Sequence, residues 1–140
     1  MYLIRLIYAS RVQGSMSTED VAQILETSRH NNSKSNITGL LCFNHKYFLQ
    51  CLEGSRAKVN GLYQRILHDN RHGDILLLSY GEVSERHFSQ WSMGYIPATQ
   101  ITEDITLRFS GGSEFNPYEM AGPSADAMMV ELAKRTPTLA

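Results

Sequence analysis

Two side chains within apolar segments, Tyr8 and Gln50, could form hydrogen bonds in a buried setting. Gln50 lies in the second of two apolar runs, Ile37–Phe43 and Tyr47–Leu52, which the short polar stretch Asn44–Lys46 separates. Two such runs joined by a few turn residues predict a β-hairpin. A primary amide has two donors and an acceptor oxygen, and burying it without partners costs about 1–3 kcal/mol. We therefore expect Gln50 to have a partner, and we expect that partner to be a ligand.

The strands around these two residues decide whether they can meet. The alternating segment Tyr2–Ala9 predicts a first strand that places Leu6 and Tyr8 on one face, and Gln50 shares a face with Phe48. In a β-α-β-β-α-β arrangement the first and third strands are neighbours. If both faces point toward the helices, the phenol and the amide meet beneath the groove between those helices.

Two amphipathic helices would form the walls of this groove. The first is predicted over Thr18–Asn31, with Ser17 opening a capping box and Ser28 ending the core-facing row. The polar cluster Asn31–Asn36 that follows predicts a turn. The second helix is predicted over Arg56–His68. Both helices precede a predicted strand, which favours a sheet covered by helices on one face.

The remaining elements complete an α+β fold. Ile75–Tyr80 predicts an apolar strand buried on both faces, and Trp91–Ile96 predicts a fifth strand. The predicted fold is ferredoxin-like, β-α-β-β-α-β plus a fifth strand, with a mixed sheet and both helices on one face. We expect residues 1–97 to form this domain. Residues 98–140, with a helix over Ser124–Arg135, would be a C-terminal appendage that covers the sheet or contacts another subunit.

Composition excludes several classes of function. The chain has 140 residues, 13 of them Lys or Arg and 14 Asp or Glu, so no overall basic field attracts nucleic acid. It has no apolar run of about 18 residues and no signal-peptide pattern, which predicts a cytoplasmic protein without a membrane span. The five His residues show no ligand spacing, and Cys42 and Cys51 lie in strands, so we expect no metal site.

The predicted groove suits a flat ring with hydrogen-bonding edges, because amides and apolar side chains surround it and cations could bind a phosphate tail at its mouth. The residues expected to contact such a ligand are Ile24, Ser28, Arg29, Asn31, Asn32, Phe48, Gln50, Arg65, Ile66, Asp69, Arg71 and His72. Simpler explanations compete for each residue. A strand Tyr commonly belongs to the core, a strand Gln is commonly half exposed, and an Asn pair after a helix commonly forms a turn.

Six short motifs, taken in order, resemble those of one known family. They are L-I-Y-A-S at Leu6–Ser10, N-N at Asn31 and Asn32, N-I-T-G-L-L at Asn36–Leu41, F-L-Q-C-L-E-G at Phe48–Gly54, R-H at Arg71 and His72, and W-S-M at Trp91–Met93. From about Leu3 to Ile96 the chain resembles the BLUF domain, a blue-light sensor that uses flavin. One departure is Asn70, where the family often has Pro. The chain most resembles short members that carry no fused enzyme and signal through other chains.

The resemblance implies a noncovalently bound flavin between the two helices. FAD is the usual cofactor, with FMN and riboflavin as alternatives. Tyr8 matches the tyrosine that gives an electron and a proton to the excited flavin, and Gln50 matches the glutamine that bridges that phenol and the flavin. Asn32 matches the asparagine at the C4=O/N3 edge of the ring, and Asn31 lies beside it. Ser28 matches a serine next to the glutamine.

The resemblance also implies a signal route. Trp91 and Met93 match the pair on the fifth strand that relays a changed hydrogen-bond pattern around Gln50, and which of them lies nearer the flavin in the dark stays open. No net bond is made, so we expect no enzyme activity; we expect a homo-oligomer or a signalling partner to receive the signal. The alternatives are a light-independent ferredoxin-like ligand-binding module and an acylphosphatase-like hydrolase. The hydrolase is disfavoured because Arg11–Ser15 is a poor phosphate loop.

Overall fold

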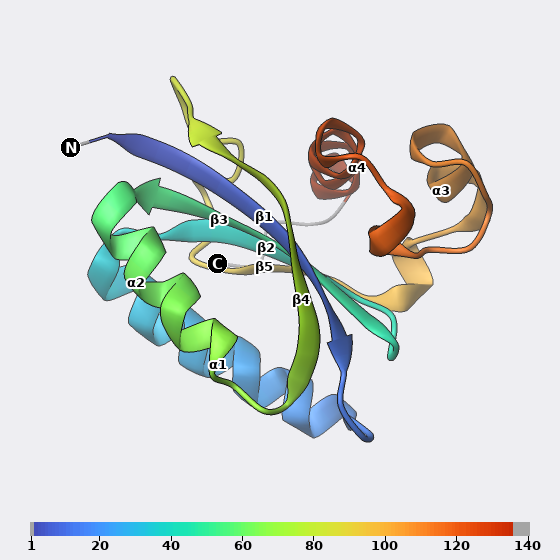
Figure 1. Ribbon diagram of the computed structural model, residues 1–140, viewed down its shortest axis with the longest axis horizontal. Helices are drawn as coiled ribbons and strands as arrows, with labels where there is room; N and C mark the ends of the chain where they lie inside the picture. Colours follow the sequence, from blue (N-terminus) through green and yellow to red (C-terminus); the bar gives the residue numbers. More distant parts are fainter. Residues whose placement is uncertain (1, 136–140) are drawn as a thin grey trace.

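A five-stranded mixed sheet forms the centre of the computed structural model, which describes residues 2–135 (Figure 1). The strands are β1 Leu3–Val12, β2 Thr38–Phe43, β3 Tyr47–Ser55, β4 His72–Glu82 and β5 Gly94–Ile96. Their order is β4-β1-β3-β2-β5; β5 runs parallel to β2 and the other neighbouring strands are antiparallel. The ferredoxin-like prediction with a fifth strand is therefore confirmed, and β1 and β3 are neighbours at the middle of the sheet.

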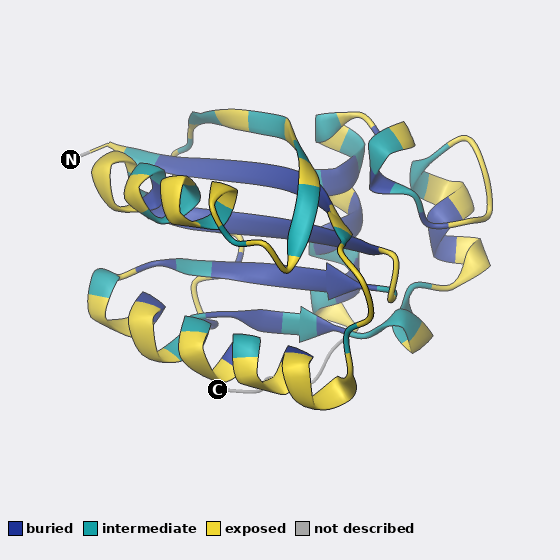
Figure 2. Ribbon diagram, turned by 60° about the horizontal axis from the view of Figure 1, so that its bottom comes forward, coloured by how far each residue is buried: buried dark blue, intermediate teal, exposed yellow. Residues whose placement is uncertain are grey.

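Helices cover both faces of the sheet. Helices α1 (Thr18–Ser35) and α2 (Arg56–Leu67) lie on the same face of the sheet, with their outer surfaces exposed (Figure 2). Helices α3 (Glu103–Phe109) and α4 (Gly122–Lys134) lie beyond the opposite face (Figure 1). Short 3₁₀ turns at Ala98–Gln100 and Pro117–Glu119 connect them to the chain.

The alternation of side chains along the strands separates two hydrophobic cores. The core between the sheet and α1/α2 contains Leu6 and Leu52, whereas the core beneath α4 contains Ile7, Cys51 and Met128. Burial raises the pKa of the Cys51 thiol well above its ordinary value, so this thiol acts as a small hydrophobic side chain. The described part of residues 98–140 thus packs on the sheet. The domain division at residue 97 stays a prediction, and residues 136–140 lie outside the described range.

Helix α1 is longer than the sequence suggested. The capping box at Ser17 is present, but the predicted turn at residues 31–36 is wrong, because the helix continues to Ser35. Asn36 then ends it in the left-handed conformation, with φ of 55°, and donates its N–H to the carbonyl of Asn32. Asn32 is buried, and its side-chain amide donates to the carbonyl of Ser92 at 2.8 Å. This tertiary contact outweighs the weak helix propensity of the segment.

Strand β4 and the segment before β5 also differ from expectation. The predicted burial of β4 on both faces is wrong, because β4 is an edge strand in which Leu76 and Leu77 are 41% and 46% exposed. The predicted fifth strand is halved, because only Gly94–Ile96 pairs with β2. Residues 91–93 precede it as an irregular segment. A side chain at Gly94 would place its Cβ 2.7 Å from the Trp91 ring, so only glycine permits this close packing.

Candidate functional site

Tyr8 and Gln50 lie directly opposite each other in the β1–β3 ladder, on the face that α1 and α2 cover. Both are buried, with 3% and 7% of their surface exposed, and the Tyr8 hydroxyl donates a hydrogen bond to Gln50 Oε1. The side-chain N–H₂ of Gln50 contacts the sulfur of Met93 at 3.5 Å. A thioether is a weak acceptor, so this amide nitrogen can still donate to a stronger partner.

The phenol of Tyr8 is neutral in its resting state. Burial raises the pKa of Tyr8 far above its ordinary value, and Tyr63 and Asp69 raise it further. Tyr63 also packs on it, with the two ring centroids 5.7 Å apart. The phenolic proton therefore stays in place over the physiological pH range unless the ring also loses an electron. In the structure this proton is shared with Gln50 Oε1 through the hydrogen bond between the two side chains.

A cavity of about 200 Å³ opens between α1, α2 and the sheet, next to Tyr8 and Gln50. Its walls are formed by Tyr8, Ile24, Thr27, Ser28, Asn31, Asn32, Leu41, Phe48, Gln50, Leu62, Arg65, Ile66, Asp69, Arg71 and His72. All residues predicted from the sequence to contact the ligand line this cavity, apart from Arg29.

Three wall residues were missed by the sequence analysis, and a simple signal could have found each of them. Thr27 lies one helical turn after Ile24, and Leu62 lies one turn before Ile66, so each continues a row of wall residues. Leu41 pairs with Gln50 across the β2–β3 hairpin. Thus the periodicity that identified the helices also defines the side walls of the cavity.

Charged side chains surround one end of the cavity. Arg71 Nε lies 3.0 Å from both carboxylate oxygens of Asp69, and this hydrogen bonding lowers the pKa of Asp69 and raises that of Arg71. Arg65 contributes a second cation to the wall. Because Asp69 already pairs with Arg71, this end of the cavity can attract an anion through Arg65 and through the remaining donors of Arg71.

His72 connects the end of α2 to β1. Its Nε2 lies 3.0 Å from the carbonyl of Ile66, and its Nδ1 lies 2.7 Å from the Ser10 hydroxyl. A carbonyl only accepts, so Nε2 is the donor, and the Ser10 hydroxyl can donate to Nδ1. The ring also lies edge-on to Phe48, with centroids 6.0 Å apart. His72 thereby fixes the distance between two walls of the cavity.

Helix α1 holds the segment of residues 91–93 in place. Arg29 Nε donates to the carbonyl of Met93 at 2.9 Å. Arg29 therefore contacts this segment and does not line the cavity. The two large side chains of the segment point into different cores: Met93 packs beside Gln50, and Trp91 packs on the α4 side of the sheet. Among the buried side-chain polar atoms of the described residues, only the Trp91 indole nitrogen lacks a hydrogen-bond partner.

The residues present suit a flavin. The amides of Gln50, Asn31 and Asn32 match the carbonyl and N–H groups along one edge of its ring, and apolar side chains such as Ile24 and Ile66 match the faces of the ring. The cations at the charged end match a phosphate tail. Within residues 2–135, no group of three or more His, Cys, Asp or Glu side chains could hold a metal ion.

Comparison with known proteins agrees with this chemistry. The family model of BLUF, "Sensors of blue-light using FAD", matches residues 3–94, and the chain belongs to this family. FAD is the cofactor that the description of the family names. Solved structures with the same fold include BlsA in its photo-activated state, with a TM-score of 0.87 and 31% identity over 99% of both chains. The dark-state structure of BlrB gives a TM-score of 0.79 at 28% identity over 96% of both chains.

Curated relatives are much longer than the matched region. The photoactivated adenylate cyclase subunit beta of Euglena gracilis is 33% identical over 108 residues, which cover 76% of this chain and 12% of that protein. The blue light- and temperature-regulated antirepressor BluF of Escherichia coli (strain K12) is 31% identical over 91 residues, or 65% of this chain and 23% of that protein. The chain therefore spans only a minor part of these relatives.

Proposed function

We propose that the chain is a blue-light photoreceptor in which Tyr8 and Gln50 form the switch. The observation that supports this most directly is the hydrogen bond from the buried, neutral phenol of Tyr8 to the amide of Gln50 at the wall of the cavity. The proposed cofactor is FAD, with its ring held by Gln50, Asn31 and Asn32 and its phosphates near Arg65 and Arg71. FMN and riboflavin would place the same ring in the same walls.

The proposed switch cycle involves one electron and one proton and makes no net bond. When bound, the photoexcited flavin supplies a strong oxidant. Tyr8 gives up an electron and passes its proton along the hydrogen bond to Gln50, and both later return to Tyr8. The lasting change is in the Gln50 amide, which rotates or tautomerises. A stronger hydrogen bond from this amide to a ring carbonyl lowers the excited state more than the ground state, which shifts the absorption to the red.

Met93 is the proposed first receiver of this change. A rotated amide presents its oxygen, in place of its nitrogen, to the Met93 sulfur, and two acceptors do not attract each other. The backbone of residues 91–93 would then shift against its contacts with α1. Trp91 belongs to the same segment and carries a buried N–H without a partner, so a new position can gain a hydrogen bond. This is a two-state packing change that a local hydrogen bond biases.

We further propose that the chain acts without enzyme activity, in the cytoplasm, through another protein chain. The described helices include none that is long and apolar enough to cross a membrane. The cyclase and antirepressor relatives carry a similar sensor within larger proteins, which supports a signalling partner here.

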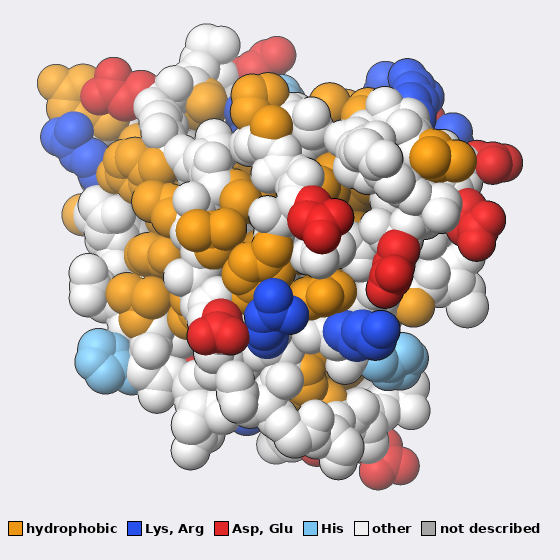
Figure 3. Space-filling view, turned by 45° about the vertical axis from the view of Figure 1, so that its right-hand side comes forward, with side chains coloured by type: hydrophobic (Ala, Val, Ile, Leu, Met, Phe, Trp, Pro, Cys, Tyr) orange, Lys and Arg blue, Asp and Glu red, His pale blue; other side chains and the backbone are white. Residues whose placement is uncertain are grey.

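The exposed edge of β4 supports a homo-oligomer. Hydrophobic side chains gather on the face of the molecule that Figure 3 shows. Within β4, the side chains of Leu76, Leu77 and Tyr80 are exposed. Such an edge favours association with another chain. Leu77→Lys should reduce the mass of the purified protein in light scattering without changing its flavin spectrum. Leu107→Lys, at an exposed residue of α3, is the matched control; an unchanged mass for Leu77→Lys would contradict this proposal.

Absorption spectroscopy tests the proposed function. The purified protein should be yellow, and blue light should shift its flavin bands reversibly to longer wavelength. Gln50→Leu should retain the flavin and lose the shift, because Leu cannot donate a hydrogen bond to the ring. A colourless protein that acquires no flavin absorption when incubated with FAD would favour the light-independent ligand-binding module instead.

A further inference from the structure

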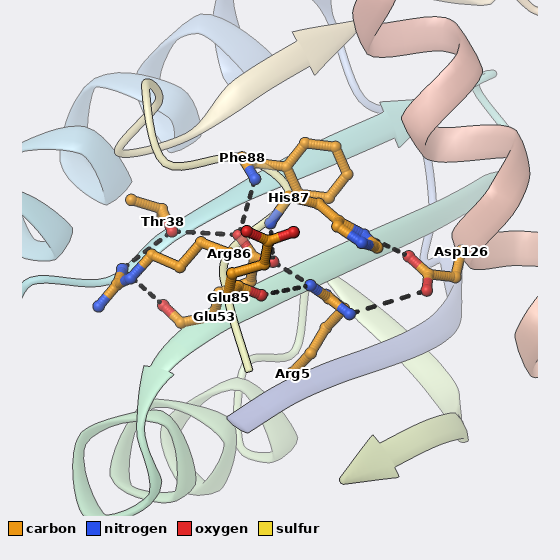
Figure 4. A network of polar contacts seen from close by, with 8 residues as sticks. All are labelled: Arg5, Thr38, Glu53, Glu85, Arg86, His87, Phe88 and Asp126. Atoms are coloured by element: carbon orange, nitrogen blue, oxygen red, sulfur yellow. Dashed lines mark hydrogen bonds and ion pairs between the residues drawn. The ribbon is translucent and has the colours of Figure 1, made fainter. Parts of the chain in front are cut away.

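A second buried polar pair joins β1 to β3, on the face opposite Tyr8 and Gln50. Arg5 lies across the ladder from Glu53, and its Nε donates to Glu53 Oε2 at 2.9 Å. Glu53 is fully buried, with 0% of its surface exposed. Figure 4 shows these two residues at the centre of a set of hydrogen bonds and ion pairs that reaches three further parts of the chain.

The carboxylate of Glu53 fixes the loop that follows β4. It accepts hydrogen bonds from the backbone N–H of His87 at 2.7 Å and of Phe88 at 2.9 Å, and from the Thr38 hydroxyl at 3.2 Å. Together with Arg5, these donors fill the roughly four hydrogen-bond acceptor positions that a carboxylate offers. Hydrogen bonds to a charged group are stronger than neutral ones, so this end of the loop is firmly attached to the sheet.

The same loop is linked to α4. His87 Nδ1 lies 3.2 Å from Asp126 Oδ1, and Arg5 Nη1 lies 3.8 Å from Asp126 Oδ2. Arg5 Nη2 also donates to the carbonyl of Glu85 at 3.0 Å. Asp126, in the first half of α4, therefore contacts both the arginine that pairs with Glu53 and the loop residue beside it (Figure 4).

The other end of the loop touches the switch. The N–H of Trp91 bonds to the carbonyl of Phe88 at 3.1 Å, and Met93 follows two residues later, with its sulfur against Gln50. Residues 85–93 thus run from the Glu53 carboxylate on one face of the sheet to the Gln50 amide on the other. A loop that is rigidly held at residues 87–88 transmits a shift at residue 93 instead of absorbing it.

We propose that Glu53 and Asp126 are positioning residues that couple the hydrogen-bond change at Gln50 to helix α4. Glu53 keeps residues 85–88 attached to the sheet, so movement of Met93 changes the strain on this loop. Asp126 passes that strain to α4 through His87 and Arg5. The coupling rests on the proposed light switch, but it concerns residues outside the flavin cavity.

Hydrogen exchange of the flavin-loaded protein, in the dark and under blue light, tests this coupling. Amide exchange of residues 122–134 should differ between dark and lit wild-type protein. Asp126→Asn removes the charge that faces His87 and Arg5. It should reduce this light-dependent difference about twofold or more, while the red shift of the flavin bands stays unchanged. If Asp126 only stabilised the fold, Asp126→Asn would change the amide exchange of residues 122–134 equally in the dark and in the light.

The controls separate the possible failures. Glu131→Gln removes a different charge from α4. Glu131 pairs with Arg108 and Arg135 and is not among the residues around Glu53 that Figure 4 shows. This variant should therefore leave the light-dependent difference intact. Glu53→Gln should reduce the light-dependent difference as Asp126→Asn does. If Glu53→Gln does not fold, the result for Asp126→Asn alone tests the coupling. A full light-dependent difference in Asp126→Asn, or none in wild-type protein that shows the red shift, overturns the coupling. Absence of the red shift in wild-type protein refutes the photoreceptor function itself.

Discussion

Two cross-strand pairs of the same two strands differ in how their hydrogen bonds are satisfied. Tyr8 with Gln50 and Arg5 with Glu53 each join β1 to β3, three residues apart along the chain and therefore on opposite faces. Gln50 has one strong partner and one weak one, the Met93 sulfur, and it borders a cavity. Glu53 has four hydrogen-bond donors and is fully buried.

The difference assigns opposite tasks to the two pairs. A neutral hydrogen bond contributes about 0.5–1.5 kcal/mol, so Gln50 can exchange partners at small cost, whereas each bond to a charged group contributes about 1.5–3 kcal/mol. To exchange its partners, the Glu53 carboxylate would have to lose several of these stronger hydrogen bonds at once. The sheet therefore carries an adaptable pair on the helix face and a fixed pair on the other face, and the loop of residues 85–93 connects them.

The stability of variants should separate the two pairs most clearly. Glu53→Ala leaves Arg5 buried without its partner and should lower the free energy of unfolding by about 3–5 kcal/mol. Gln50→Leu should lower it by only about 1–3 kcal/mol, because it leaves a neutral group, the buried Tyr8 hydroxyl, without its acceptor. Urea unfolding of both variants measures this. Equal losses for the two would contradict the contrast between a fixed and an adaptable pair.

Alkaline pH should weaken the protein through Tyr8. Burial raises the folded-state pKa of Tyr8 above the value of about 10 for an unfolded chain. Its contribution to stability is therefore complete below about pH 10 and is lost as the pH rises toward the folded-state pKa, by up to about 1.4 kcal/mol per pH unit. Tyr8→Phe should lose less stability between pH 10 and 11, as measured by urea unfolding. The same slope in both proteins would show that Tyr8 is not shielded from water.

The local elements and the neutral pair could be predicted from the sequence. Alternation placed Tyr8 and Gln50 on one face, and helical periodicity placed Ile24, Ser28 and Ile66 along the groove. That prediction required the Tyr8 face of the first strand and the Gln50 face of the third strand to point to the same side of the sheet. The observed β1–β3 pairing fulfils this condition.

Features that depend on distant contacts could not be predicted. Residues 91–93 alternate as a strand would, yet their backbone is bound by Asn32 and Arg29 from α1. The apolar run in β4 cannot distinguish a buried strand from an exposed edge. The Arg5–Glu53 pair was missed, although a charged residue inside each of two apolar strands was a usable signal, because a buried charge requires a partner.

The light-minus-dark absorption spectrum of Tyr8→Phe tests the central claim most directly. The variant keeps the ring that lines the cavity and lacks only the hydroxyl that bonds to Gln50. We predict that it binds flavin, is yellow in the dark and shows no reversible red shift, whereas the wild-type protein shows one. A red shift of normal size in Tyr8→Phe would contradict a switch that begins with the loss of an electron and a proton from Tyr8.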